Sequence, residues 1–210
     1  MLRRALDLLA PPGCWACGGP VNLASPLCPA CASELPWREA STGRRDGAID
    51  RAAAPLALAG PARDLVHALK FRDAPGVASL MAAHVVHALP AGFFDPRAAV
   101  VAVPPHPGRR RRRGYDHADA LARAIATRTG LPLAAPLVRA GGRGARQRGA
   151  GRRARLAGAA VAVRAAGAAP ARCLLVDDVR TTGATLQLCA RALRDAGARR
   201  VDAVVYAQAP

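Results

Sequence analysis

The segment Cys173–Thr185 contains the residues best suited to chemistry. An apolar run ends in two acids, Asp177 and Asp178, and a loop of small and hydroxyl residues then leads into a predicted helix. Such a loop offers free backbone N–H groups, hydroxyls and the positive end of a helix dipole, which together bind phosphate. The two carboxylates are placed to accept hydrogen bonds from ribose hydroxyls or to help hold Mg²⁺ on a polyphosphate. The residues predicted to bind the phosphate are Arg180, Thr181, Thr182, Gly183, Ala184 and Thr185.

A plainer interpretation of this segment is an ordinary strand-to-helix turn capped by threonine. The two acids followed by Thr-Thr-Gly-x-Thr favour the phosphate loop, and a Walker A loop is excluded because no Gly-Lys-Ser/Thr follows. The segment resembles the phosphoribosyl-pyrophosphate (PRPP) signature of type I phosphoribosyltransferases. That signature ends in two apolar residues, whereas this chain has Leu186 and Gln187, so the ending is only half met.

Four of the six cysteines form two C-x₂-C pairs, separated by ten residues: Cys14 with Cys17 and Cys28 with Cys31. Two such turns make a tetrahedral thiolate site, which suits a structural Zn²⁺ and leaves no open position for catalysis. The alternatives are a pair of disulfides or a thioredoxin-like redox motif. A redox motif has one such pair beside a βαβ unit, not two pairs in a Gly/Pro-rich head. Cys173 and Cys189 are expected to be core residues.

The elements that position these residues alternate between strand and helix, which predicts a parallel α/β sheet flanked by helices. Ligands of such sheets bind at the carboxyl ends of the strands. Two motifs fall at such ends, the phosphate loop and the Pro-Pro-His turn after residue 103. The chain divides into a helix and zinc module over 1–50 and the α/β domain over 51–210. Strands are expected at 52–59, 98–103, 133–138, 159–163, 172–177 and 201–206, and helices at 62–71, 75–89, 117–129 and 183–196.

The composition is strongly basic, with a net charge of +17 over 210 residues. Such a charge favours polyanions as partners, although a merely solvated basic surface is the competing interpretation. Aromatic residues are only 3 % of the chain, which argues against a base-stacking platform for single strands. No run reaches the length of a membrane span, and the first ten residues make a poor signal peptide, so a cytoplasmic location is expected.

The order of parts resembles the ComF family, competence-associated proteins with an N-terminal cysteine module and a phosphoribosyltransferase-like domain. The matching features span nearly the whole chain. They are the two C-x₂-C pairs, Leu69-Lys70-Phe71, Val101-Ala102-Val103-Pro104, Arg113-Gly114-Tyr115, Gln147, Arg155 and the acid pair with its loop. One departure is that the family's Arg-Gly-Phe-Asn-Gln becomes Arg113-Gly114-Tyr115-Asp116-His117.

The resemblance implies a site that binds PRPP with Mg²⁺. The 5′-phosphate would lie on the loop 181–185, and the ribose hydroxyls would be held by the acid pair, the candidate catalytic residues. The pyrophosphate side would be formed by Lys70, Val103, Pro104, Pro105, His106 and Arg113. Gln147 and Arg155 belong to the segment 139–155, which occupies the place of the group's hood loop.

Three functions are compatible with these features. The first is a PRPP-binding accessory protein of DNA uptake, acting with single-stranded DNA through its arginines and with a helicase-like partner. The second is an active phosphoribosyltransferase that releases pyrophosphate while transferring ribose 5-phosphate to an unidentified acceptor. The third is a zinc-bearing adaptor with an inactive site. A homodimer is compatible with the fold, but no residue in the sequence fixes its interface.

Overall fold

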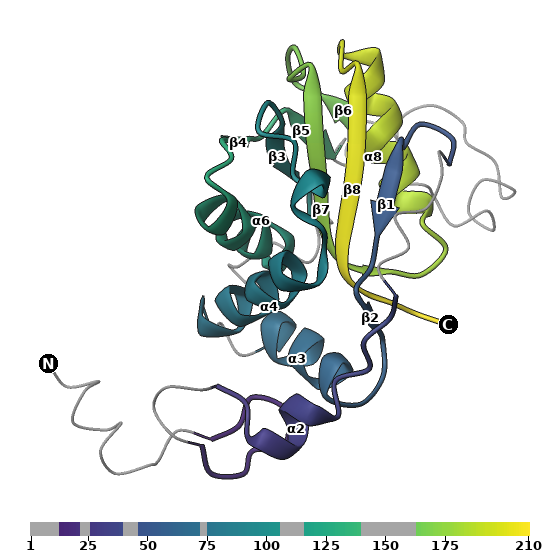
Figure 1. Cartoon of the computed structure of the whole chain (residues 1–210). Helices are drawn as coiled ribbons and strands as arrows, with labels where there is room; N and C mark the ends of the chain where they lie inside the picture. Colours follow the sequence, from purple (N-terminus) through teal and green to yellow (C-terminus); the bar gives the residue numbers. More distant parts are fainter. Residues whose placement is uncertain (1–12, 22–25, 40–45, 72–74, 106–115, 140–162) are drawn as a thin grey trace, which may run out of the picture.

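The computed structural model describes residues 13–21, 26–39, 46–71, 75–105, 116–139 and 163–210 (Figure 1). The described residues form helices and strands along most of their length. In chain order they are α2 (Pro29–Ser33), β1 (Arg51–Ala53), β2 (Leu56–Ala57), α3 (Gly60–Phe71), α4 (Pro75–Ala88), a 3₁₀ turn (Ala91–Phe93), β3 (Ala99–Ala102), α6 (His117–Thr129), β4 (Leu133–Ala134), β5 (Leu137–Arg139), β6 (Val163–Ala165), β7 (Arg172–Arg180), α8 (Ala184–Asp195) and β8 (Arg200–Gln208).

The main sheet has six strands, all of them parallel where they pair. Its order is β1-β8-β7-β3-β4, with β2 also paired to β8. The longest pairing joins β7 and β8, from Arg172 beside Arg200 to Arg180 beside Gln208. Strands β5 and β6 form a separate antiparallel pair, which brackets the segment 140–162. The central strands are buried on both faces, which explains their nearly continuous apolar sequence.

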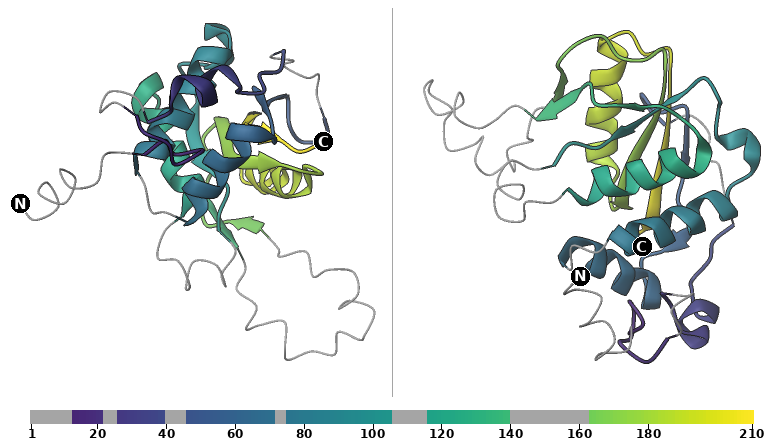
Figure 2. Two further views of the ribbon diagram at one scale, coloured as in Figure 1. Left: turned by 90° about the horizontal axis from the view of Figure 1, so that it is seen from below. Right: turned by 90° about the vertical axis from the view of Figure 1, so that its left-hand side faces the viewer.

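Helices cover both faces of this sheet (Figures 1 and 2). One layer of the core joins α3, α4 and α6 to the side chains of Val100, Leu174, Val176, Val204 and Tyr206. The opposite layer joins α8 to Val101, Leu175, Val201, Ala203 and Val205. The period-2 alternation of the strands sends neighbouring residues to opposite layers. The parallel α/β architecture predicted from the sequence is therefore confirmed.

Helix α6 begins and ends at the residues the sequence predicts, because both of its ends are capped. Asp116 accepts hydrogen bonds from the backbone N–H groups of Ala118 and Asp119, at 3.1 and 3.4 Å. Gly130 ends the helix with φ of 72°, a left-handed conformation that glycine adopts without steric cost. The two caps therefore set the length of α6, and the Asp116 cap makes His117 its first residue.

Two predicted strands are each divided by a proline. The strand expected over 52–59 forms β1 and β2, with Pro55 between them. The strand expected over 133–138 forms β4 in the main sheet and β5 in the small one, with Pro136 between them. Proline has no N–H for the ladder, so the strand is interrupted there. The division of the chain into domains at residue 50 stays a prediction.

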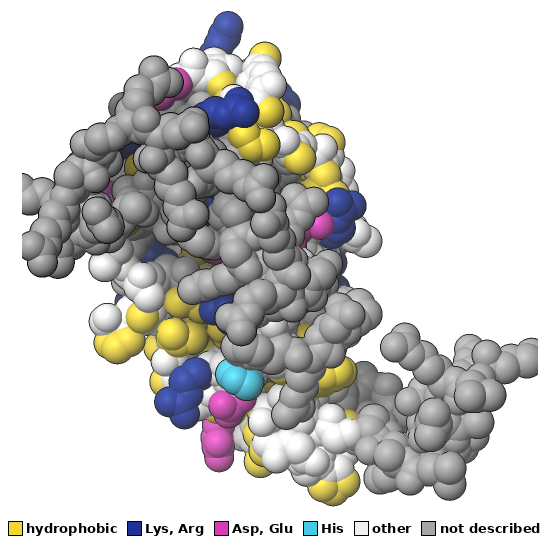
Figure 3. Space-filling model, turned by 180° about the vertical axis from the view of Figure 1, so that it is seen from behind, with side chains coloured by type: hydrophobic (Ala, Val, Ile, Leu, Met, Phe, Trp, Pro, Cys, Tyr) yellow, Lys and Arg dark blue, Asp and Glu magenta, His cyan; other side chains and the backbone are white. Residues whose placement is uncertain are grey.

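The surface seen from behind carries scattered charges. On that face the arginine and lysine side chains of the described residues lie apart, with acidic and hydrophobic side chains between them (Figure 3). Within the described part of the chain, no helix is long and apolar enough to cross a membrane.

Candidate functional site

The acid pair lies near the carboxyl end of β7, as predicted. Asp178 is 5 % exposed, and Asp177 is partly buried. The backbone N–H of Asp178 donates to Asp177 Oδ1 at 2.9 Å. Burial, and after it the negative charge of Asp178, raise the pKa of Asp177 well above its ordinary value. The hydrogen bond from the Asp178 N–H and the positive charge of Lys70 act in the opposite direction. Asp177 therefore holds a proton more readily than an isolated aspartate does.

Two basic side chains approach the pair from different helices. Lys70, in the last turn of α3, places Nζ 2.8 Å from Asp178 Oδ2. His117, the first residue of α6, places Nε2 3.9 Å from Asp178 Oδ1. The Lys70 ammonium is the charged neighbour of buried Asp178 Oδ2, which accepts no hydrogen bond within the described residues. A buried carboxylate oxygen in this state is suited to accept a hydroxyl from a ligand.

The predicted phosphate loop lies between β7 and α8. Residues 181–183 form the connection, and Thr181 and Thr182 are both exposed. Gly183 has φ of 76°, and a Cβ added there would lie 3.2 Å from Arg180 Nε, so the Arg180 side chain folds over the loop. The N–H of Ala184 points to Thr182 Oγ1 at 3.4 Å. Exposed hydroxyls, the N–H groups of the first turn of α8 and the arginine thus lie around one small surface.

Gln187, the residue that departs from the expected apolar ending, has a clear contact. Its Nε2 donates to the carbonyl of Asp46 at 2.7 Å, and its Oε1 accepts from the N–H of Ala48 at 3.1 Å. Gly47, with φ of 57°, leaves room for this side chain. Asp46 also lies 3.5 Å from Arg180 in an ion pair. The polar residue therefore fastens the segment 46–48, which follows the four cysteines, to the helix that follows the phosphate loop.

Residues Val103–Pro105 continue from β3 to the same end of the sheet. The N–H of Val103 donates to the carbonyl of Val176 at 2.9 Å, just before the acid pair. Arg139, at the end of β5, donates from Nε to the carbonyl of Pro104 at 2.6 Å. The structure thus brings together Lys70, the turn 103–105 and the acid pair. Four predicted residues, His106, Arg113, Gln147 and Arg155, lie outside the described residues.

Sequence reasoning missed His117 and Arg139 as site residues. His117 entered only as a departure from the family pattern, although its place directly after the helix cap Asp116 directs it toward the sheet. Arg139 stood at the edge of an arginine-rich segment without a distinguishing pattern. Its contact with Pro104 depends on the small β5-β6 sheet, which brings the two segments together.

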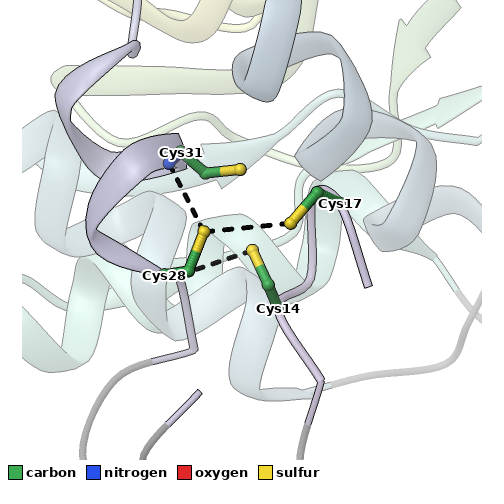
Figure 4. Close-up of side chains that lie close together, drawn as sticks. All are labelled: Cys14, Cys17, Cys28 and Cys31. Atoms are coloured by element: carbon green, nitrogen blue, oxygen red, sulfur yellow. Dashed lines mark hydrogen bonds between the residues drawn. The ribbon is translucent and has the colours of Figure 1, made fainter. Parts of the chain in front are cut away.

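The four cysteines of the amino-terminal module meet as predicted (Figure 4). Their sulfur atoms all lie within 4.8 Å of one another, and Cys17 Sγ is 3.8 Å from Cys28 Sγ. Four sulfurs at a Zn–S distance of about 2.3 Å form a tetrahedron with edges of about 3.8 Å. Backbone N–H groups donate to three of the sulfurs, as from Cys28 to Cys14 Sγ at 3.4 Å. Short helix α2 begins at Pro29, after its cap Cys28, and so holds Cys31 over the cluster.

The electrostatics of this cluster also fit a cation. Burial raises the pKa of Cys14, but backbone N–H groups, first those of Cys17 and Cys28, lower it to about 6. Burial and the neighbouring sulfurs, in contrast, raise the pKa of Cys31 far above its ordinary value. Four adjacent thiols cannot all ionise without a compensating charge, which a bound Zn²⁺ supplies. The residues present therefore fit a structural zinc ion.

Residues 5–49 match the family described as the double zinc ribbon domain. This segment contains four cysteines and no histidine, so its Cys and His side chains provide ligands for one tetrahedral site. Comparison with curated proteins gives no match.

Three of the solved structures similar to this chain are enzymes. They are glutamine PRPP amidotransferase from B. subtilis complexed with ADP and GMP (20 % identity, 67 % of this chain, 30 % of that chain, TM-score 0.43), the allosteric regulatory enzyme of purine biosynthesis (20 %, 67 %, 30 %, 0.41) and Leishmania donovani UMP synthase (18 %, 68 %, 24 %, 0.35). The matched part spans less than a third of each of those chains.

Proposed function

We propose that this chain binds PRPP, or a closely related phosphosugar, at the carboxyl end of β7. The observation that carries the proposal is the buried acid pair directly before a hydroxyl-rich loop at the start of a helix. Asp178 Oδ2 is buried beside the Lys70 ammonium and accepts no hydrogen bond within the described residues, and Thr181 and Thr182, three and four residues later, are exposed. The carboxylates are suited to accept hydrogen bonds from sugar hydroxyls, and the threonine loop is suited to bind a phosphate. A phosphosugar carries both kinds of group.

Each part of the ligand has a set of residues to receive it. The 5′-phosphate lies on the loop 181–185 with Arg180 beside it, and the ribose hydroxyls donate to the acid pair. The pyrophosphate extends toward Lys70 and the turn 103–105. His106 and Arg113 are proposed for the same side, and Gln147 and Arg155 for the hood loop, on the resemblance alone.

Magnesium is proposed to bind together with PRPP. Ligand atoms of His117, Asp177 and Asp178 lie within 4.8 Å of one another. Mg²⁺ prefers oxygen, so the carboxylates are suitable ligands and the imidazole is not. When bound, the ion would neutralise part of the pyrophosphate charge.

The family resemblance extends the proposal to a cellular role. The chain is proposed to be a ComF-like protein, with the zinc module over 1–50 and the phosphosugar-binding domain over 51–210, that supports DNA uptake or DNA utilisation in the cytoplasm. Single-stranded DNA and a competence helicase are the proposed partners, and a homodimer is compatible with this role. The basic composition supports a polyanionic partner.

Active phosphoribosyl transfer is the alternative, and the arrangement around Asp178 supports it. An acceptor would attack C1 of PRPP, the bond from C1 to the pyrophosphate oxygen would break, and pyrophosphate would leave. The carboxylates would stabilise the positive charge that develops on the ribose ring, and Lys70 would oppose the charge on the leaving group. A zinc-bearing adaptor whose site binds no phosphosugar is the second alternative.

The test is calorimetric titration of the zinc-loaded protein with PRPP, with and without Mg²⁺. We expect Mg²⁺-dependent binding in the unmutated protein and a loss of at least ~30-fold in affinity in Asp178→Asn, since a charge-assisted hydrogen bond contributes about 2 kcal/mol or more. Asp119→Asn is the matched control, because Asp119 pairs with Arg123 on the outside of α6. If the unmutated protein does not bind PRPP, the proposal is wrong and the zinc-bearing adaptor is the function that remains.

Turnover and cellular role need separate measurements. Pyrophosphate release that appears with one acceptor and disappears in Asp178→Asn identifies an active enzyme. In a naturally competent host that lacks its own ComF protein, this chain should restore transformation and the Asp178→Asn variant should not. Equal restoration by both would separate the cellular role from phosphosugar binding.

A further inference from the structure

A second polar pocket lies at the opposite end of the sheet from the acid pair. It is a cavity of about 490 Å³ lined by Asp50, Arg51, Ala171, Arg172, Arg199 and Arg200. Arg51, Arg172 and Arg200 are the first residues of β1, β7 and β8, so the pocket is at the amino ends of three neighbouring strands. In Figure 1 this is the upper end of the sheet, away from the carboxyl terminus.

The pocket places like charges next to each other. Arg172 and Arg200 are register partners on parallel strands, an arrangement in which like charges repel. Asp95 accepts from Arg172 Nη1 at 2.6 Å, and Asp202 lies 3.1 Å from Arg200 Nε. Each contact uses one edge of a guanidinium that carries five N–H donors, so further donors are left on both arginines.

The remaining arginines differ in how firmly they are held. Arg51 is held firmly, because it donates to Asp202 at 2.7 Å and to the carbonyls of Gly92 and Phe93, and it lies over the Phe93 ring. Arg199 is exposed, and within the described part of the chain its guanidinium makes no hydrogen bond or ion pair. The pocket thus contains one arginine, Arg51, that is fixed by several contacts and another, Arg199, whose guanidinium is available to a ligand.

The local charge is positive even after the aspartates are counted. The four lining arginines are joined by Arg194, which pairs with Asp50, and by Arg97, which pairs with Asp95. These six arginines face Asp50, Asp95 and Asp202, which leaves a formal charge of about +3.

We infer that this pocket is a second phosphate-binding site, separate from the proposed phosphosugar site. A guanidinium offers parallel N–H donors that match two oxygens of a phosphate, and its positive charge persists at every physiological pH. The cavity volume is within the range of small-molecule sites and exceeds what a single phosphate fills. No aromatic residue lines it. Recognition is therefore of phosphates, from a nucleotide-like polyphosphate or from the backbone of a nucleic acid strand, and not of bases.

The test uses the full-length, zinc-loaded protein with two probes, tripolyphosphate and a fluorescein-labelled single-stranded oligonucleotide of mixed sequence. Arg199→Gln is the variant, since its side chain is exposed and its loss leaves the ion pairs intact. Arg191→Gln is the control, because it removes the same charge from an exposed arginine on α8 that does not line the pocket. Asp178→Asn serves as the variant of the other site.

We expect Arg199→Gln to weaken binding of at least one probe about 3- to 10-fold, with little change in Arg191→Gln. If the strand is the ligand, the salt dependence of oligonucleotide affinity also falls by about 0.7 in slope. If the source is a small polyphosphate, only tripolyphosphate binding weakens. Equal effects of the two arginine variants would overturn the inference, as would a loss found only in Asp178→Asn. Failure of PRPP to bind would leave this result unchanged, because the two sites share no residue.

Discussion

The Lys70→Met substitution tests whether the ion pair at the centre of the site is also a structural element. Lys70 Nζ lies 2.8 Å from Asp178 Oδ2, with the two side chains 26 % and 6 % exposed. At an effective dielectric constant of about 20, two unit charges at that distance attract by about 6 kcal/mol. The cost of removing both charges from water offsets much of this attraction, and the exposed part of Lys70 allows screening. We therefore expect a net loss of about 2–3 kcal/mol, somewhat below the usual cost of breaking a fully buried pair.

The loss should depend on pH through Asp177. Its pKa is already raised by burial and by Asp178, and the Lys70 charge is one of the influences that hold it down. An acid whose pKa is raised by folding penalises the folded state fully above the raised pKa, and the penalty disappears as the pH falls to the ordinary pKa of aspartate. Removal of Lys70 raises the pKa further. The variant should therefore lose more stability at about pH 7.5 than at about pH 4.5, which is close to that ordinary pKa.

The assay is urea denaturation of the zinc-loaded protein at both pH values. Lys70→Arg retains the charge and should lose less than Lys70→Met. The double variant Lys70→Met/Asp178→Asn removes both charges and should recover at least half of the lost free energy of unfolding. A loss below about 0.5 kcal/mol at both pH values would refute the reasoning, as would a double variant no more stable than Lys70→Met.

Three further predictions concern other parts of the molecule. Cys28→Ser should release the zinc, from about one ion per chain to well under half, as measured with a chromogenic chelator, whereas Cys189→Ala should retain it. Gly183→Ala should lower the free energy of unfolding by about 1–2 kcal/mol and weaken PRPP binding, because Gly183 has a φ of 76° and Arg180 crowds the added Cβ. An unchanged midpoint of urea denaturation would contradict this prediction. Burial, and then the charge of a neighbouring histidine, lower the pKa of His84 from 6.5 to about 4. The folded state therefore binds that proton less readily than the unfolded chain, so stability should fall between about pH 6.5 and pH 4. His84→Gln should flatten that fall in melting temperature, and an unchanged slope would exclude His84 as its cause.

The sequence by itself determined the local chemistry of this protein. The C-x₂-C spacing requires that each pair of sulfurs face one side of a turn, and the four sulfurs indeed meet. The apolar run before Asp177 and the small residues after it determine a strand, a turn and a helix, since each depends on neighbours within a few residues. The alternation of strands and helices determined the parallel sheet, because crossover helices must cover its faces.

Only the tertiary structure decided which distant residues meet. Lys70 and His117 reach Asp178 from α3 and α6 because both helices pack on the same face of β7. The contact of Gln187 with Asp46 and the pairing of Arg172 with Arg200 likewise join segments without a shared sequence pattern. Such contacts depend on strand order and register, which arise from packing of the whole core rather than from the preferences of any one segment. For the same reason, the arginine pocket is recognisable only once β1, β7 and β8 lie side by side.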